Sequence, residues 1–223
     1  MNKILAIAPH PDDETLGCGG TILKHKKEGD KVHWLIVTAM KENIGYSVNK
    51  IRQRSTEIEK VIKVYGFSSV HQCAFPATML DAIPMSEIVF KIGSVIKKVQ
   101  PNIVYVPFYG DVHSDHRIVF DAVSSCLKWF RYPSIERVLA YETLSETDVA
   151  LAPSTSIFHP NVFIDVSKFL RKKIDIMKLY KGEMGTFPFP RSKEAICALA
   201  AVRGTASGFK AAEAFVLLKE IIK

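Results

Sequence analysis

The segment KILAIAPHPDDETLGCGGTILKHKKEGDKVHWLIVTA, residues 3–39, decides the fold class of this chain. Its two ends, residues 3–8 and 31–39, are apolar runs of strand length that are rich in Ile and Val, and residues 15–29 predict a helix that ends at Gly29. Parallel strands need a long crossover connection, and a helix usually supplies it. The segment therefore predicts a unit of strand, helix and parallel strand.

The same alternation continues along the chain. It predicts further strands over residues 68–75, 102–108, 136–142 and 160–166, and helices over residues 49–66, 85–99, 116–130, 167–182, 193–204 and 210–223. We therefore expect an α/β fold: a Rossmann-like, doubly wound, mainly parallel sheet with helices on both faces and a helical C-terminal third. We see no linker and no internal repeat beyond this rhythm, so residues 1–223 are expected to form a single domain.

Composition narrows the class of protein. The 223 residues carry a formal net charge of +7, but the basic residues are dispersed and their clusters fall on predicted helices, which does not favour nucleic-acid binding. No apolar run is long enough for a membrane-spanning helix, and the N-terminal segment does not read as a signal peptide. The four cysteines are scattered, as in a reducing compartment. We expect a cytoplasmic protein without an integral membrane segment.

Two clusters of acids and histidines each follow a predicted strand. Ligands of parallel α/β sheets bind at the carboxyl ends of the strands, so such residues are the first candidates for a site. The first cluster lies in PHPDDE, residues 9–14, and the second in GDVHSDH, residues 110–116. Together they offer His10, Asp12, Asp13, Glu14, Asp111, His113, Asp115 and His116.

These residue types suit a catalytic metal ion. Imidazole and carboxylate bind zinc when cysteine is absent, and a catalytic site uses three such ligands and keeps one position for water. The remaining carboxylate could then act as a general base, and the remaining histidine could stabilise an oxyanion or protonate a leaving group. Alone, Asp12 or Asp13 would more simply cap the following helix, and His113 or His116 would be an ordinary loop or helix-start histidine. Two such clusters at strand ends favour the metal site.

The glycines in LGCGG, residues 16–20, raise the alternative of a dinucleotide site. The fingerprint of that site places glycines directly after the strand, where backbone N–H groups face a pyrophosphate. Acidic residues occupy this turn here, and no acid follows residues 31–39 to bind a ribose. We therefore expect Gly17, Gly19 and Gly20 to let the first helix pack closely on the sheet.

At these residues the sequence resembles the LmbE-like family, also called the PIG-L family, of metal-dependent N-deacetylases that act on N-acetylglucosaminyl compounds. PHPDDE is similar to the family motif A-H-P-D-D-E, and HSDH, residues 113–116, is similar to H-P-D-H. Pro9 stands where the family has alanine, and Ser114 where it has proline. Weaker similarity in RSTE, residues 54–57, and in three later segments extends the resemblance over nearly the whole chain.

The resemblance implies a role for each matching residue. It implies that His10, Asp13 and His116 are ligands of zinc or another divalent transition metal. It further implies that Asp12 is the general base, that His113 stabilises the oxyanion and acts as the acid, and that Asp115 orients the neighbouring histidine. Arg54 would line the substrate side, although an ion pair with Glu57 on the helix surface would equally explain it.

The implied function is a zinc-dependent hydrolase that removes the acetyl group from an N-acetylated sugar and releases acetate and a free amine. Two alternatives stay open: a catalytically idle module that binds a nucleotide sugar or another small molecule, and a metal amidohydrolase for a non-sugar N-acyl compound. The expected partner is a small N-acetyl sugar, whose conjugate could carry phosphate or a nucleotide; relatives of this kind often form homo-oligomers. Tyr109, Asp111, Tyr141, Glu142 and the loop TFPFPRS, residues 186–192, are weakly marked candidates for substrate recognition.

Overall fold

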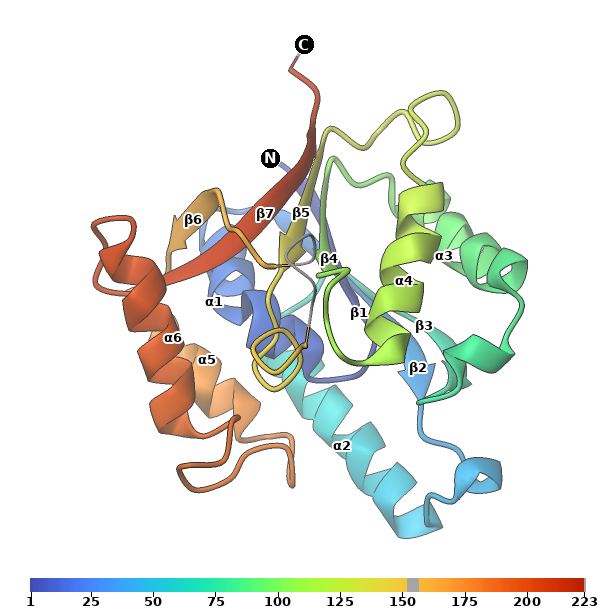
Figure 1. The fold of residues 1–223 in the computed structure, drawn as a ribbon. Helices are drawn as coiled ribbons and strands as arrows, with labels where there is room; N and C mark the ends of the chain where they lie inside the picture. Colours follow the sequence, from blue (N-terminus) through green and yellow to red (C-terminus); the bar gives the residue numbers. More distant parts are fainter. Residues whose placement is uncertain (152–156, 223) are drawn as a thin grey trace.

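The computed structural model of the chain describes residues 1–151 and 157–222, which form a doubly wound sheet with helices on both faces (Figure 1). Within this part of the chain the sheet has seven strands in the order β3-β2-β1-β4-β5-β7-β6. The strands are β1 Lys3–Ala8, β2 Lys31–Ala39, β3 Ser69–Pro76, β4 Ile103–Pro107, β5 Arg137–Tyr141, β6 Val162–Asp165 and β7 Ala212–Glu220. The first five strands in this order run parallel. At one edge, β7 pairs antiparallel with both β5 and β6, so among the seven described strands β7 alone runs in the opposite direction.

The helices cover the two faces of the sheet unequally. They are α1 Asp13–Lys27, α2 Val48–Tyr65, α3 Met85–Val99, α4 Ser114–Ser125, α5 Leu170–Met177 and α6 Lys193–Thr205, with short 3-10 turns η1 Glu42–Ile44 and η2 Leu80–Ala82. Helices α3 and α4 pack on one face, and the other four lie on the opposite face (Figure 1). The mainly parallel, doubly wound sheet expected from the sequence is confirmed.

Alternating residues of β1 belong to two separate apolar cores, one on each face of the sheet. Ile4, Ala6 and Ala8 pack into the core under α1 and α2, whereas Leu5 and Ile7 pack into the core under α3 and α4. A central strand that is covered on both faces must be apolar at every position, which explains the unbroken run ILAIA.

The side on which strands are added to the sheet changes at β1. Strands β2 and β3 lie on one side of β1, and β4 and β5 lie on the other. Strand β1 pairs in parallel with β2 on one side and with β4 on the other, so the loops that leave β1 and β4 diverge at their carboxyl ends. This arrangement opens the crevice in which doubly wound proteins bind ligands. The two acid and histidine clusters of the sequence lie in these two loops.

Helix α1 packs on the sheet through its glycines, as the sequence predicts. A Cβ atom on Gly17 would lie 2.1 Å from the ring of Tyr141, and one on Gly20 would lie 2.8 Å from Val166. The helix is interrupted at Cys18, whose φ of −140° is not helical. No larger residue than glycine fits at these close approaches without moving its neighbours.

The interruption of α1 is held by a buried ion pair. The Lys173 ammonium donates to the Leu16 carbonyl and to Glu213, both at 2.7 Å. Glu213 also accepts from the backbone N–H groups of Gly20, at 2.8 Å, and Thr21, at 2.7 Å. The pair thus satisfies backbone groups that the break in the helix leaves without helical partners.

The helix predicted over residues 210–223 is wrong. Residues 212–220 form β7, which lies between β5 and β6, and Lys223 is outside the described residues. The Ala, Glu, Leu and Lys content of this segment favours a helix, but pairing on both sides and burial of Phe215 outweigh that weak preference. The C-terminal third therefore contains β7 in addition to the helices α5 and α6 and the strand β6, which matches the strand predicted over residues 160–166. Within the described part of the chain, no helix combines the length and apolar character needed to cross a membrane.

Candidate metal and catalytic site

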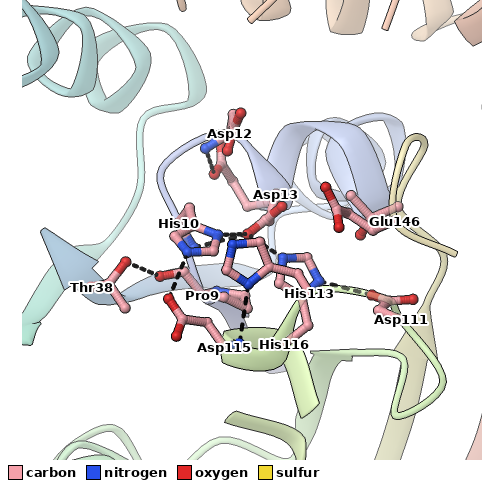
Figure 2. A network of polar contacts seen from close by, with 12 residues as sticks. Pro9, His10, Asp12, Asp13, Thr38, Asp111, His113, Asp115, His116 and Glu146 are labelled. Carbon is pink, nitrogen blue, oxygen red and sulfur yellow. Dashed lines mark hydrogen bonds and ion pairs between the residues drawn. The ribbon is translucent and has the colours of Figure 1, made fainter. Parts of the chain in front are cut away.

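The ends of β1 and β4 bring the two clusters together (Figure 2). The first cluster spans the turn between β1 and α1, with Asp13 as the first residue of the helix. The second spans the loop from β4 to α4, with His113 at the N-cap of the helix and His116 in its first turn. Residues about a hundred positions apart in the chain are therefore neighbours at the switch point of the sheet.

Three side chains converge on a point that could hold a metal ion. The Nδ1 atom of His10 lies 3.3 Å from Oδ2 of Asp13, and Nε2 of His116 lies 3.2 Å from the same oxygen. One ligand atom from each residue lies within 4.8 Å of the other two. Two imidazoles facing one carboxylate oxygen are a suitable donor set for zinc and related ions.

Each of these imidazoles is held from behind by a second carboxylate. The other nitrogen of His116, Nδ1, lies 2.8 Å from Asp111, and the other nitrogen of His10, Nε2, lies 2.9 Å from Asp115. Carboxylates in this position fix the orientation and tautomer of metal-binding histidines. The carboxylate of Asp115 therefore orients His10, which belongs to the first cluster, rather than a histidine of its own segment.

A second possible donor group, His10, His113 and Asp115, is less suitable. The carboxylate of Asp115 already accepts backbone N–H bonds from Thr78, at 2.7 Å, and from Leu80, at 3.1 Å, in addition to its contact with His10. Its oxygens are thus committed to protein partners. The group formed by His10, Asp13 and His116 is the better candidate.

The cluster attracts positive charge. Burial would lower the pKa of His10, but its contacts with Asp115 and Asp13 outweigh burial and raise that pKa to about 9. Burial would likewise lower the pKa of His116, and the carboxylates of Asp13 and Asp111 raise it well above the usual value. Burial would raise the pKa of Asp13, but the two imidazoles hold it well below its usual range. A site that binds protons this strongly also suits a metal cation.

Asp12 lies beside this cluster with an unusual backbone conformation. Its φ is 134°, a region that residues other than glycine rarely adopt, and its backbone N–H donates to Glu14 at 3.1 Å. Its side chain is buried and makes no helix-capping hydrogen bond, so the capping alternative does not account for it. Burial and the charges of Asp13 and Glu183 raise the pKa of Asp12 well above its usual value.

Glu14, the last acid of the first cluster, holds the backbone of this turn through the N–H group of Asp12. It is fully buried and accepts hydrogen bonds from the Thr15 hydroxyl, at 2.5 Å, and from the Tyr180 hydroxyl, at 2.8 Å, besides the Asp12 N–H. Burial raises its pKa to about 7. Its contacts make it a structural support of the Asp12 conformation.

His113 faces the cavity with a defined tautomer. Its Nδ1 accepts the backbone N–H of Asp115 at 3.1 Å, so the proton of the neutral ring lies on Nε2. Burial and the positive charges of His10 and His116 lower the pKa of His113 to about 4. The ring is therefore neutral at neutral pH and offers one N–H donor.

A cavity of about 370 Å³ opens beside the cluster. It is bounded by His10, Asp12, Asp13, His113 and His116 and extends to Arg54 on α2. This volume is at the lower end of the range for small-molecule sites, roughly 300 to 1,000 Å³. Of the seven residues to which the family resemblance gives a role, six line this cavity. The seventh, Asp115, contacts His10 on the side of the ring away from Asp13.

Arg54 is a buried residue of this cavity, and its pairing with Glu57 is only one of its contacts. Its Nε lies 3.3 Å from Glu57, its Nη1 donates to the Pro11 carbonyl at 3.0 Å, and its Nη2 pairs with Glu183. The ion pair between Arg54 and Glu57 that the sequence allowed is present, but it is buried and does not lie on the helix surface. The guanidinium links α2 to the turn that carries Asp12.

The sequence analysis did not single out three of the charged residues at this site, Glu146, Glu183 and Arg191. Glu183 and Arg191 lie in the loop between α5 and α6, and Arg191 donates to Asp12 at 3.1 Å and to Glu183 at 2.9 Å. Arg191 belongs to the loop marked in the sequence for its aromatic and proline content, but nothing local indicates that it reaches the end of β1. Glu146, after β5, also lines the cavity (Figure 2).

The weakly marked candidates for recognition have mixed outcomes. Asp111 contacts His116 and the Thr147 hydroxyl, which makes it part of the cluster. Tyr141 is fully buried, and its hydroxyl donates to the Ile7 carbonyl at 2.8 Å. Glu142 pairs with Arg203 of α6 at 2.6 Å. Tyr141 and Glu142 are thus structural, and neither is among the residues that line the described cavity.

The doubly wound sheet, with its acid and histidine clusters at the ends of β1 and β4, defines this chain as a Rossmann-like α/β protein with a candidate metal site at the carboxyl ends of its strands. Residues 5–127 match the model of the PIG-L family, described as GlcNAc-PI de-N-acetylase. The match covers more than half of the chain, which therefore belongs to the PIG-L family of deacetylases.

Similar proteins carry names that agree with this family. A diacetylchitobiose deacetylase from Thermococcus kodakarensis is 27% identical over 222 residues, which cover 96% of this chain and 82% of the relative. A probable N-acetyl-alpha-D-glucosaminyl L-malate deacetylase 2 from Bacillus cereus is 29% identical over 191 residues, covering 81% of this chain and 83% of the relative. The crystal structure of a conserved protein from Thermus thermophilus has a TM-score of 0.78 at 24% identity and covers 100% of this chain and 97% of its own. The similarity to the Thermus thermophilus structure shows the fold alone.

Proposed function

We propose that this protein is a metal-dependent N-deacetylase that removes the acetyl group from an N-acetylated sugar and releases acetate and a free amine. The observation that carries this proposal is the cavity in which the His10, Asp13 and His116 cluster faces a buried carboxyl, Asp12, and a neutral imidazole, His113. Family membership and the names of the relatives supply the reaction and the substrate class.

The residues present fit a divalent transition metal such as zinc. His10, Asp13 and His116 would hold it, because their ligand atoms converge and both imidazoles are supported by carboxylates on their far side. When bound, such an ion activates water and polarises a carbonyl oxygen as a Lewis acid. The fit rests on donor chemistry and on the orientation of the two rings.

Asp12 is the group best suited to accept the proton of the attacking water and then to pass that proton to the leaving nitrogen, which departs as the free amine. A general base works best when its pKa lies near the working pH, and burial raises the pKa of Asp12 toward that range. The charge of Arg191 opposes this increase and fixes one oxygen of the carboxylate, leaving the other to act on water. The positive φ of Asp12 is the kind of strain that a catalytic turn retains.

His113 is suited to donate a hydrogen bond to the oxyanion that forms on the acetyl carbon. Its Nδ1 is occupied by the Asp115 N–H, so its one available proton, on Nε2, is free for this purpose. Asp115 itself acts as a positioning residue, since its carboxylate orients His10 and its backbone orients His113. Arg54 lines the same cavity and would contact the sugar.

Metal analysis of the purified protein is the first experiment. We expect about one zinc or similar ion per chain after reconstitution, and loss of that ion in the His116→Ala variant. His159→Ala is the matched control, because His159 is exposed and lies outside the candidate donor groups found among the described residues. A reconstituted protein without bound metal would overturn the proposal and favour a binding module.

Activity is measured as amine released from N-acetylglucosaminides by the metal-loaded protein. The Asp12→Asn variant keeps the shape of the side chain but removes the base, and we expect a loss of at least about 100-fold in kcat with the metal retained. Equal activity in this variant would exclude Asp12 as the general base. Loss of metal in the same variant would instead indicate that Asp12 is a ligand.

A further inference from the structure

Among the described residues that line the cavity, the permanently cationic side chains are those of Arg54 and Arg191, and both already contact carboxylates. Four carboxylates, of Asp12, Asp13, Glu146 and Glu183, and two guanidiniums, of Arg54 and Arg191, line it. Among the residues that the structure describes, no lysine lines this space. With a divalent ion held by His10, Asp13 and His116, the positive charges of the ion and the two guanidiniums would equal the negative charges of the four carboxylates. The cavity therefore has no surplus of positive charge, although the whole chain carries a net charge of +7.

Both guanidiniums are already paired. Arg54 contacts the carboxylates of Glu57 and Glu183, and Arg191 contacts those of Asp12 and Glu183. Glu183 thus bridges the two arginines, and each guanidinium has two acidic partners. A phosphate or carboxylate of a substrate would have to displace one of these acids, which would leave a partly buried carboxylate without its partner.

The metal site does not supply the missing positive charge. An ion held by His10, Asp13 and His116 would have the carboxylates of Asp13, Asp12 and Glu146 in the same cavity (Figure 2). These acids offset a divalent charge at the place where the acetyl group must bind. No surplus is left for a second anionic group of the substrate.

Apart from Arg54, the described residues that form the wall away from the cluster are uncharged. It is formed by β2, the loop that follows it, α2 and β3, with an apolar and neutral polar surface made by Met40, Tyr46, Ile51, Ser55, Ile58 and Gln72. Lys50 lies over the ring of Tyr46, 5.5 Å from its centroid, but does not line the cavity. Such a wall suits an uncharged sugar or aglycone, which binds through apolar ring faces and neutral hydrogen-bonding groups.

We infer that the substrate is a neutral conjugate of an N-acetylated sugar, and that conjugates carrying a phosphate or carboxylate next to the sugar are poor substrates. This inference rests on the proposed deacetylase function and adds to it the charge class of the substrate. It selects among the conjugates left open by the sequence, for which the net charge of the chain slightly favours a phosphate-bearing or nucleotide-linked glycan over a neutral one. Glu183 is the residue that we expect to set this preference, because it is the one carboxylate among these partners that contacts both arginines.

Three probes test the inference on the zinc-loaded protein. Amine release is measured with N,N′-diacetylchitobiose, which is uncharged, and with N-acetylglucosaminyl malate and N-acetylglucosamine 1-phosphate, which are anionic. We expect kcat/KM for the neutral compound to exceed both anionic values at least tenfold. An anionic compound used as well as the neutral one, or better, overturns the inference.

A charge variant tests the role of Glu183. In Glu183→Gln the two guanidiniums lose a shared acidic partner, so we expect kcat/KM for the anionic probes to rise several-fold relative to the neutral probe. Glu194→Gln, at an exposed position in the first turn of α6, changes the net charge equally and should leave this ratio unchanged. An unchanged ratio in the folded Glu183→Gln protein contradicts the assignment.

Failure of the deacetylase proposal gives a different result. If none of the three compounds releases amine from the metal-loaded protein, the proposed function is wrong. Calorimetric titration of the wild-type protein with the same compounds then decides the charge preference alone. Tighter binding of either anionic compound overturns the inference, and tighter binding of the neutral one supports it.

Discussion

Replacement of Lys173 by methionine tests whether the buried ion pair with Glu213 stabilises the break in α1. Methionine keeps most of the length and apolar volume of the side chain and removes its charge. The Lys173 ammonium donates to the Leu16 carbonyl and to Glu213 at 2.7 Å, and both side chains are at least nine-tenths buried. The variant therefore leaves a buried carboxylate without its counter-charge and one backbone carbonyl without its donor.

The expected magnitude follows from these contacts. Removing one partner of a buried ion pair costs about 3 to 5 kcal/mol. Glu213 keeps its hydrogen bonds from the Gly20 and Thr21 N–H groups, which limits the loss to this range. For a chain of this size the cost corresponds to a decrease in Tm of roughly 6 to 20 °C.

Urea unfolding of the single and double variants measures this effect. Lys173→Met with Glu213→Gln removes both charges, so we expect the double variant to be more stable than the sum of the single effects predicts by at least about 1 kcal/mol. Lys178→Met is the control, because Lys178 pairs with Asp175 on the exposed surface and should contribute less than about 1 kcal/mol. A cost below about 1 kcal/mol for Lys173→Met, or strict additivity, would refute the reasoning.

Three further predictions concern the site and its surroundings. Asp111→Asn removes the carboxylate behind His116, so metal affinity should fall about 10- to 100-fold in competition with a chelator. Arg191→Met removes a charge that lowers the pKa of Asp12, so that pKa should rise and the acidic limb of the kcat/KM profile should move to higher pH. Burial would raise the pKa of Asp30, but hydrogen bonds from Asn2 and the contact with His25 lower it. The stability that Asp30 contributes is therefore present above about pH 4, the pKa of Asp in the unfolded chain, and is lost as the pH falls through the lowered pKa of the folded protein. The difference in unfolding free energy between the wild type and Asp30→Asn should therefore shrink on acidification.

Each of these predictions has a result that contradicts it. Unchanged chelator competition in the Asp111 variant would mean that the carboxylate does not support a metal ligand. A fixed acidic limb in the Arg191 variant would exclude Asp12 as the group that titrates there. A pH-independent difference for Asp30→Asn would show that its carboxylate has the same pKa in the folded and unfolded chain.

The local sequence was sufficient for the strands of the parallel part of the sheet. An apolar run between turn residues, such as residues 3–8, has few alternatives to a buried strand, because only a covered position excludes polar residues so completely. The C-terminal strand β7 could not be predicted in this way. Its composition favours a helix, and only pairing with β5 and β6 decides otherwise.

The two motifs located the candidate site because chain connectivity places residues after β1 and β4 at the same edge of the sheet. The partners of those residues could not be read from the motifs. Asp115 orients His10 from the other cluster, across a separation of 105 residues, and Arg191 reaches Asp12 across 179 residues. Hydrogen bonds of this kind depend on how the loops fold over the sheet, which no local pattern records.

The sequence by itself determined the alternation of strands and helices and the chemistry of His10, Asp12, Asp13, His113 and His116, since apolar periodicity and side-chain type are local properties. Only the tertiary structure decided which acids and bases meet, and therefore the charge of the cavity. The net charge of +7 is a sum over the chain, whereas the charge that a substrate meets depends on which guanidiniums are already paired. That pairing is set by packing of α2 and the loop before α6 against the end of β1.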